Sequence, residues 1–247
     1  MTLFRIGFLF AIVAIVTACG GGGGGGVTAN NSAIVGIALD SASAPTKLYV
    51  TNADNQTIQV VTLSTNAVTT LAGTANTAGS ADGTGSVAKF FSPFGIALSG
   101  SDVFIADLYN HTIRKLTSAG VVTTHAGTAG TTGANDAAGL NATFYGPKSL
   151  VSDGTNLYVT DTSNHTIRKV VISTRDVSRL AGYASATGVA NGTGSDARFN
   201  APFGIAFDGT NLYVTDTGNQ TIRKVTTTGV VTTLAGTAGT AGSTDAA

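Results

Sequence analysis

The sequence repeats with a period of about 55 residues, and this repetition limits the possible folds more than any other feature. Residues 211–224 read NLYVTDTGNQTIRK, and near-copies occupy residues 156–169 and 102–115. A more divergent copy, KLYVTNADNQTIQV, occupies residues 47–60. A fixed period of this size is typical of solenoids, propellers and arrays, in which no single unit buries its apolar face alone. We therefore expect one domain that is tiled from similar units.

Each unit has the pattern of a four-stranded antiparallel meander. In the last complete unit, strands are predicted at residues 203–207, 212–215, 220–226 and 230–234. Gly, Asn and Asp residues separate them, as in tight turns. Four short strands joined in this way form one blade of a propeller. The predicted fold is all-β, a β-propeller within residues 33–247, with blades at about residues 33–73, 93–127, 147–182 and 202–236.

The loops between blades are about 20 residues long, which exceeds ordinary loop lengths and predicts either functional loops or extended blade edges. Each complete loop ends with a phenylalanine three residues before a proline, at Phe90, Phe144 and Phe199. We expect these side chains to fill the gap between adjacent blades, because aromatic residues that recur in a repeat usually serve packing. The alternative is that they contact a ligand.

The motifs PFGIA and LYVTDT-x-N-x-TIRK resemble the NHL repeat, whose members build β-propellers, commonly with six blades. The resemblance covers residues 33–236, and the first copy departs from it with Asn52 and with Gln59-Val60. Six blades of this period would need about 330 residues. The four blades are therefore expected to be part of a truncated six-bladed propeller, an open arc or a small closed ring. Residues 237–247 begin a further inter-blade loop, and an open arc would favour self-association through its strand edges.

The N-terminal residues have the pattern of a bacterial export signal. Arg5 precedes an apolar run at residues 6–16, which is too short to span a bilayer. An N-terminal membrane helix is the alternative. Val16-Thr17-Ala18-Cys19 resembles the lipobox of bacterial lipoproteins, which implies a signal peptide at residues 1–18 and a lipid on Cys19. Cys19 is the single cysteine of the chain, so it has no disulfide partner, and the alternative is an incidental cysteine.

Residues 19–32 include seven consecutive glycines and are expected to form a flexible tether between membrane and domain. A phosphate-binding loop is not expected, because the glycines lack a flanking strand and helix and a following Lys-Ser or Lys-Thr. Gly20 stands where an aspartate in many such lipoproteins signals retention in the inner membrane. The resemblance thus implies the bacterial cell envelope, lipid-anchored in the outer membrane, on its periplasmic or surface face.

Charge and composition limit the partners. Acidic and basic residues balance at thirteen each, and the charged content is only 11%. Since the sequence contains no basic stripe, nucleic acid is not expected as a partner.

Two charged positions recur in the repeats and are candidate site residues. Asp107, Asp161 and Asp216, with Asn52 in the first copy, are expected to cap the following turns, although a ring of carboxylates around the channel is the alternative. Three arginines recur seven residues later: Arg114, Arg168 and Arg223. They are candidates for a basic ring that binds an anionic ligand. The alternative is that they solvate exposed strands and pair with nearby aspartates.

No pattern of catalytic or metal-binding residues is evident. His111 and His165 occupy equivalent positions a full blade apart, which is unsuited to converging on one ion, and His125 replaces a leucine of the other repeats. Propeller lactonases and lyases use metal centres rich in Glu or His, and this chain has no Glu. We therefore expect no metal or cofactor and a non-catalytic scaffold that binds a protein or a glycan. The alternatives are a propeller enzyme (lactonase, lyase or hydrolase) with catalytic residues in blades missing from this chain, and a structural role in envelope assembly.

Overall fold

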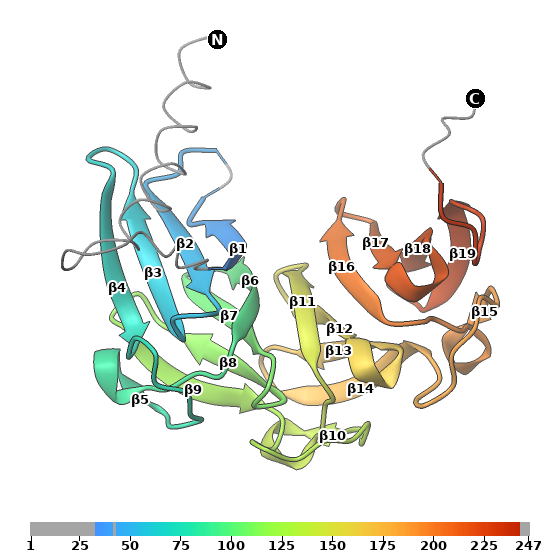
Figure 1. Ribbon diagram of the computed structural model, residues 1–247, viewed down its shortest axis with the longest axis horizontal. Helices are drawn as coiled ribbons and strands as arrows, with labels where there is room; N and C mark the ends of the chain where they lie inside the picture. Colours follow the sequence, from blue (N-terminus) through green and yellow to red (C-terminus); the bar gives the residue numbers. More distant parts are fainter. Residues whose placement is uncertain (1–32, 42, 243–247) are drawn as a thin grey trace, which may run out of the picture.

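The computed structural model describes residues 33–41 and 43–242. The predicted signal peptide (residues 1–18), Cys19 and the tether (residues 19–32) lie outside these residues. The described chain is organised as four antiparallel sheets that follow one another along the sequence, as the repeat predicts (Figure 1).

Each sheet corresponds to one predicted blade, and its four main strands are consecutive in the chain. Blade 1 contains β1 (Ile34–Leu39), β2 (Lys47–Asn52), β3 (Thr57–Thr62) and β4 (Ala67–Gly73). Blade 2 contains β6 (Pro93–Ser99), β7 (Asp102–Asp107), β8 (Thr112–Leu116) and β9 (Val121–Ala126). Blade 3 contains β11 (Pro147–Ser152), β12 (Asn156–Asp161), β13 (Thr166–Val171) and β14 (Asp176–Gly182). Blade 4 contains β16 (Pro202–Phe207), β17 (Asn211–Asp216), β18 (Thr221–Thr226) and β19 (Val230–Ala235).

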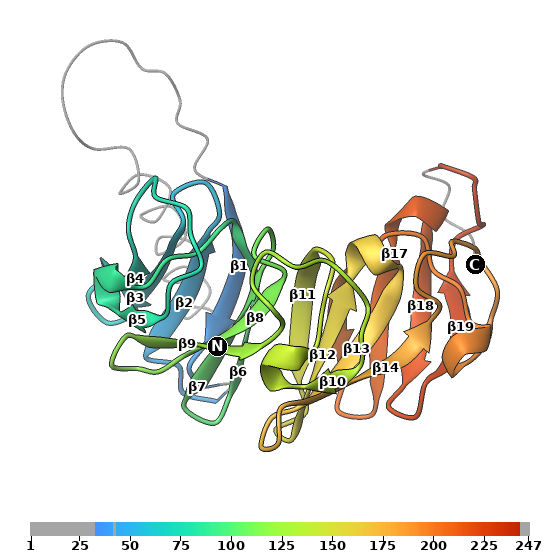
Figure 2. The ribbon, with the colours of Figure 1, turned by 90° about the horizontal axis from the view of Figure 1, so that it is seen from below.

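The blades form an open arc, with blade 1 and blade 4 at its two ends (Figures 1 and 2). The first strands of successive blades, β1, β6, β11 and β16, lie next to one another on the inside of the arc. Gly95 of the PFGIA motif allows this close approach, because a Cβ atom there would lie 2.5 Å from the carbonyl oxygen of Lys148 on the next strand. Of the arrangements that the sequence left open, the described residues thus adopt the arc and not the small closed ring.

The inter-blade loops extend the outer edges of the blades. Each of the three complete loops adds a two-residue strand to the last strand of the following blade: β5 (Gly83–Thr84), β10 (Ala137–Ala138) and β15 (Gly192–Thr193). A short 3-10 turn follows each one: η1 (Gly85–Val87), η2 (Gly139–Asn141) and η4 (Gly194–Asp196). Two further 3-10 turns, η3 (Thr162–Asn164) and η5 (Thr217–Asn219), follow β12 and β17. An added strand covers hydrogen-bonding groups that an edge would otherwise expose.

Most of the hydrophobic core lies between blades, where each of three clusters contains one loop phenylalanine, and a smaller cluster lies within blade 1. Phe90 is fully buried between Ile58 and Ala72 of blade 1 and apolar residues of blade 2. Phe144 and Phe199 occupy the same place at the next two junctions and are equally buried. Full burial of a phenylalanine stabilises a fold by roughly 1.5–3 kcal/mol. The packing function predicted for these residues is confirmed, and we call them the plug phenylalanines.

Candidate functional site

The inner strands line a groove of about 390 Å³ along the axis of the arc. All four blades contribute to this axial groove, through residues 35–37, 94–96, 148–151 and 203–205. The residues that follow the opening prolines of blades 2, 3 and 4 line it: Phe94, Lys148 and Phe203. Phe94 and Phe203 meet there edge to face, with ring centres 5.4 Å apart. The groove therefore combines aromatic and aliphatic side chains from the four blades with a comparable share of polar surface.

Blade 3 differs from its neighbours at this position, because Lys148 stands where blades 2 and 4 have phenylalanine. Its Nζ lies 4.5 Å from the ring centre of Phe203, as in a cation–π contact. None of the carboxylates in residues 33–41 and 43–242 forms an ion pair with it. Lys148 thus places one positive charge, without an acidic partner among these residues, beside an aromatic ring of the groove. Sequence reasoning missed this residue, although comparison of the repeats shows the substitution.

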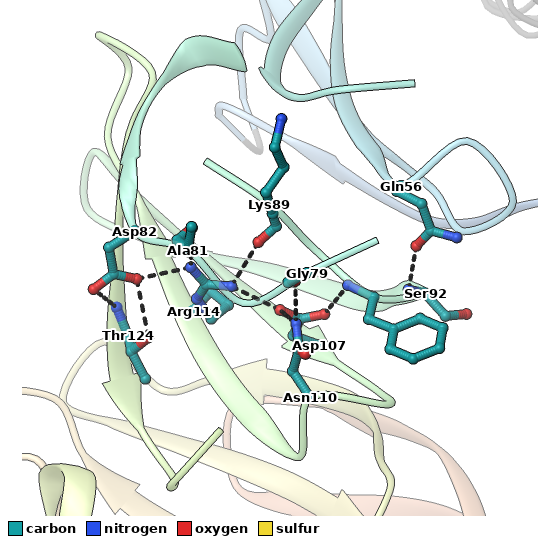
Figure 3. Close-up of polar contacts among 11 residues, drawn as sticks. Gln56, Gly79, Ala81, Asp82, Lys89, Ser92, Asp107, Asn110, Arg114 and Thr124 are labelled. Atoms are coloured by element: carbon teal, nitrogen blue, oxygen red, sulfur yellow. Dashed lines mark hydrogen bonds and ion pairs between the residues drawn. The ribbon is translucent and has the colours of Figure 1, made fainter. Parts of the chain in front are cut away.

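A cluster of three polar side chains, an aspartate, an asparagine and an arginine, is buried inside each of blades 2 to 4. In blade 2, one carboxylate oxygen of Asp107 accepts hydrogen bonds from Arg114 at 2.8 Å and from Asn110 at 2.7 Å (Figure 3). The other oxygen accepts the backbone N–H of Phe91 at 2.7 Å. Burial raises the pKa of Asp107 to about 6, against the lowering effect of Arg114. Burial has the same effect on the pKa of Asp161, which is also raised to about 6.

The guanidinium of Arg114 connects the blade with the preceding loop (Figure 3). It donates to the carbonyl oxygens of Lys89 at 2.9 Å and Ala81 at 3.0 Å, and to the carboxylate of Asp82 at 2.7 Å. It also lies over the ring of the plug phenylalanine Phe90, 5.3 Å from its centre. The contacts to two loop carbonyls and to the plug phenylalanine recur with Arg168 in blade 3 and Arg223 in blade 4. The loop side chain that accepts from Arg168 is again an aspartate, Asp136, whereas Arg223 donates to the amide oxygen of Asn191. These arginines hold the loop, and its phenylalanine, against the blade.

This placement corrects the expected basic ring. The side chains of Arg114, Arg168 and Arg223 are at most 1% exposed, and internal carbonyls and side chains accept the hydrogen bonds of their terminal nitrogens. They therefore present no charge to a ligand. The alternative of exposed strand residues is also wrong, although the pairing with aspartate that it included is observed.

The predicted turn capping is observed at Asn52 but not at Asp161 or Asp216. The side-chain oxygen of Asn52 accepts the backbone N–H of Asn55 at 3.0 Å, which is the predicted cap. Asp161 and Asp216 make no such cap to the turns that follow them. The aspartates instead bind the buried arginine, the asparagine three residues later and a backbone N–H of the preceding loop, and none is exposed. The aspartates are structural, as predicted. Each of them, however, accepts a hydrogen bond from the arginine seven residues later.

The repeated histidines also join neighbouring blades. Nδ1 of His111 accepts the backbone N–H of Gly146 at 3.2 Å, and Nδ1 of His165 accepts that of Ala201 at 3.0 Å. The side-chain oxygen of Gln56 accepts from Ser92 in the same way at 2.5 Å. Within residues 33–41 and 43–242, no three His, Cys, Asp or Glu side chains are grouped so that they could hold a metal ion. In the same residues, no helix is long and apolar enough to cross a membrane.

These features define a partial β-propeller whose loops fill the junction before each following blade. No family model matches the chain. It is 31% identical over 168 residues to NHL repeat-containing protein 2 of Homo sapiens, a match that covers 64% of this chain and 23% of the relative. The repeats are therefore of the NHL type, as their motifs predicted. The chain spans less than a quarter of the length of the curated relatives that it matches.

Solved structures show the same fold at lower sequence identity. A Bacteroides thetaiotaomicron protein of unknown function is 23% identical, with a TM-score of 0.65 over 81% of this chain and 47% of that one. An auxiliary nutrient binding protein from the same organism is 22% identical, with a TM-score of 0.61 over 80% and 47%. A streptogramin B lyase is 17% identical, with a TM-score of 0.55 over 84% and 56%. These likenesses establish the propeller fold.

Proposed function

We propose that this protein is an exported, lipid-anchored binding scaffold of the bacterial cell envelope, whose axial groove holds a protein or glycan ligand. The observation that carries the binding role is Lys148 in the groove. An apolar recess with a few polar groups that fix orientation is the usual composition of a ligand site. Among the described residues, the Lys148 ammonium has no carboxylate partner and lies over the ring of Phe203, so an acidic group on a ligand would find both a charge and contact area.

The likeness to an auxiliary nutrient binding protein supports a binding role, since that protein is described as a binder. The likeness to a lyase supports the alternative, a propeller enzyme whose catalytic residues lie in repeats outside this chain. The two proposals predict different results in one experiment, because only the enzyme would convert a bound compound.

The groove is tested with purified residues 27–247 and a panel of defined probes, namely acidic oligosaccharides and acidic peptides. For a probe that binds, Lys148→Gln is expected to weaken binding about tenfold, the loss of one charge-assisted contact. Lys47→Gln removes an exposed lysine from blade 1 and is the matched control, expected to leave binding unchanged. If Lys148→Gln binds every probe as well as the parent, the groove is not the site. Turnover of a lactone, ester or glycosyl substrate that a groove substitution abolishes would establish the enzyme instead.

The anchor is supported by the sequence of residues 1–19 and is tested separately. Expression in a bacterium fed with labelled palmitate is expected to label the full chain but not the Cys19→Ser variant. The unlabelled variant is also expected to leave the outer-membrane fraction. Equal labelling of both proteins would end the proposal of lipidation at Cys19, and it would leave the groove proposal untouched.

A further inference from the structure

Two arginines and a tyrosine gather at the junction of blades 3 and 4, and none of them lines the axial groove. Arg179 lies on β14, the outermost main strand of blade 3, and Tyr183 and Arg198 lie in the loop that leads to blade 4 (Figure 1). The guanidinium carbons of Arg179 and Arg198 lie 5.5 Å and 5.0 Å from the centre of the Tyr183 ring, as in cation–π contacts. We call these three residues the Tyr183 cluster.

Each residue of the Tyr183 cluster departs from the repeat. Blades 1, 2 and 4 have threonine at the position of Arg179, and the other three repeats have threonine at the position of Tyr183. The two earlier loops have Lys89 and Thr143 where Arg198 stands. Residues that all repeats share maintain the fold, so ligand specificity can arise at the residues that differ. Three such departures in contact with one another make this junction a candidate binding site.

In blade 2 the residue equivalent to Arg179 serves the fold. The hydroxyl of Thr124 donates to the carboxylate of Asp82, in the preceding loop, at 3.0 Å. Asp136 is the equivalent loop residue for blade 3, and it accepts the backbone N–H of Arg179 at 3.1 Å and the side chain of Arg168 at 2.7 Å. The guanidinium of Arg179 takes no part in this contact. Within residues 33–41 and 43–242 it donates no hydrogen bond and forms no ion pair.

Arg198 is held by the backbone and also lacks a carboxylate partner. Its Nη1 donates to the carbonyl oxygen of Ser195 and, at 2.9 Å, to that of Ala197. Its Nη2 makes no hydrogen bond to any residue that the structure describes. Asp196 lies two positions away in the sequence, and no ion pair joins it to Arg198. The backbone contacts thus fix the guanidinium and leave part of it available.

The Tyr183 cluster is open to solvent. The side chain of Tyr183 is 48% exposed, Arg179 is exposed and Arg198 is half-buried. Two positive charges, which no carboxylate of the described residues neutralises, therefore lie around one accessible aromatic ring. This arrangement complements a ligand that carries closely spaced acidic groups.

We propose that the Tyr183 cluster binds an acidic polysaccharide, whose carboxylate or sulfate groups contact the two guanidiniums. A guanidinium binds such oxyanions through two parallel N–H donors. Because both cations lie over one ring, acidic groups on neighbouring sugar units of one polymer can contact both. The tyrosine beside them offers an apolar ring and a hydroxyl group, and both kinds of group suit a sugar. This second site is independent of any ligand in the axial groove.

Titration calorimetry of purified residues 27–247 tests the site with three probes. Oligogalacturonate carries carboxylates, sulfated dextran oligomers carry sulfates, and dextran is uncharged. We expect at least one acidic probe to bind and dextran not to bind, and the acidic probe that binds identifies the acidic group. Binding is expected to weaken when the salt concentration rises from about 0.05 M to about 0.5 M, because salt screens exposed charges.

The variants use residues that other repeats have at the same positions. The double variant Arg179→Thr, Arg198→Thr copies blade 2 and is expected to weaken binding at least tenfold, because two charge-assisted contacts are lost. Each single variant is expected to show a smaller loss, and the single variants replace the double one if it does not fold. Tyr183→Thr is also expected to weaken binding, because the two guanidiniums lose the ring over which they lie.

The control variant Lys47→Gln, Arg175→Gln removes two exposed positive charges from other places and is expected to bind as the parent does. Lys148→Gln separates the Tyr183 cluster from the axial groove and is also expected to bind normally.

The proposal is overturned if neither acidic probe binds at about 1 mM, or if the double variant binds as tightly as the parent. An equal loss in the charge-matched control would show that the attraction is general and not local. An equal loss with Lys148→Gln would place the polysaccharide in the axial groove. Poly-aspartate that binds the cluster as tightly as the acidic probes would identify a site for acidic proteins. Each of these three results also contradicts the proposal.

Discussion

Arg168 and Asp161 form a buried ion pair at 3.0 Å that occurs with little change in three blades. A buried pair of this kind depends on the presence of both partners, because removal of one leaves the other charged and without water. Blade 1 has asparagine and glutamine, Asn52 and Gln59, at the two equivalent positions. Blade 1 therefore has two uncharged residues where blades 2 to 4 have the ion pair, and substitution in blade 3 can compare the two combinations.

We expect Arg168→Gln to lower the free energy of unfolding by about 3–5 kcal/mol, because it leaves the Asp161 carboxylate buried without its cation. The double variant Asp161→Asn, Arg168→Gln copies the residues of blade 1 and is expected to cost less than the single one. Chemical denaturation at pH 7 measures both. A double variant as unstable as Arg168→Gln would show that the side-chain geometry of blade 1 does not transfer.

His125 is expected to make the fold sensitive to acid. Burial lowers the pKa of His125 to about 4, with Lys115 and Arg175 acting in the same direction and Asp102 against it. Its Nε2 is buried without a hydrogen-bond partner, and its ring packs edge to face on Phe104. Because the unfolded chain binds a proton near pH 6.5 and the folded chain does not, stability is lost as the pH falls from about 6.5 to 4.

His125→Leu introduces the leucine that the other three repeats have at this position. Between pH 7 and pH 5 we expect the parent to lose about 1 kcal/mol more unfolding free energy than the variant, allowing for solvent screening. Urea denaturation at the two pH values gives the difference. Parallel losses in the two proteins would mean that His125 already takes up a proton in the folded state.

At this scale the sequence predicts the buried aromatics better than the buried charges. The three plug phenylalanines recur at a fixed offset and could be placed from the sequence. The arginines alternate with apolar residues along a strand, which is the pattern of exposed side chains. Their burial depends on carbonyl acceptors such as that of Lys89, 25 residues before Arg114, and no local pattern reports such a contact. Lys148 can be identified from the sequence only because it differs from the phenylalanine at the equivalent position of blades 2 and 4.

At the scale of elements, each inter-blade loop serves the blade that follows it. Its two-residue strand extends the outer edge of that blade, and its phenylalanine fills the junction with the blade before. The length of the loops, about 20 residues, was evident from the sequence. The added strands confirm the extended blade edges that were one of the two alternatives predicted from this length. Their positions were not predicted, because two residues are too few for a recognisable strand pattern.

The loop between blades 2 and 3 offers a matched pair of aromatic positions. Phe144→Ala is expected to cost about 3–5 kcal/mol of unfolding free energy, because it empties the junction between two blades. Tyr145→Ala, at the next residue, removes a ring that is 45% exposed and is expected to cost less than about 1 kcal/mol. Denaturant unfolding of both variants tests whether the plug phenylalanine, and not aromatic content in general, stabilises the junction. Equal costs would contradict this.

At the scale of the whole molecule, three core clusters each join two neighbouring blades, and a fourth lies within blade 1. Blade 3 takes part in two of these clusters, and blade 4 takes part in one. Stability in such an array is a sum of contributions from repeats and their contacts with neighbours. In a purified protein of residues 27–247, blade 4 has a neighbouring blade on one side only and should therefore open more readily than blade 3.

Hydrogen exchange followed by mass spectrometry tests this expectation. Amides of β18 and β19 are expected to exchange before those of β12 and β13, which have the same sequence pattern and pairing but a blade on each side. The comparison is internal, so it needs no variant. Equal protection of the two blades would show that the described arc unfolds as one cooperative unit.

The arc shape itself lay beyond the sequence, which left three arrangements open. The period determined the blade and the order of strands, since the pairing within each sheet is local. How successive blades are inclined depends on contacts such as that of Gly95 with the next inner strand, which involve residues more than 50 positions apart.

The loops that fill each junction have a consequence for how such a gene can grow. A repeat carries both the surface that receives a loop and the loop that fits the surface before it. Duplication of a segment of about 55 residues, in frame and from any starting point, therefore yields a protein in which every new boundary is already complementary. Lengthening of the array by recombination therefore needs no compensating mutation. Later substitutions can then distinguish one copy from the next, as Lys148 of blade 3 differs from Phe94 at the equivalent position of blade 2.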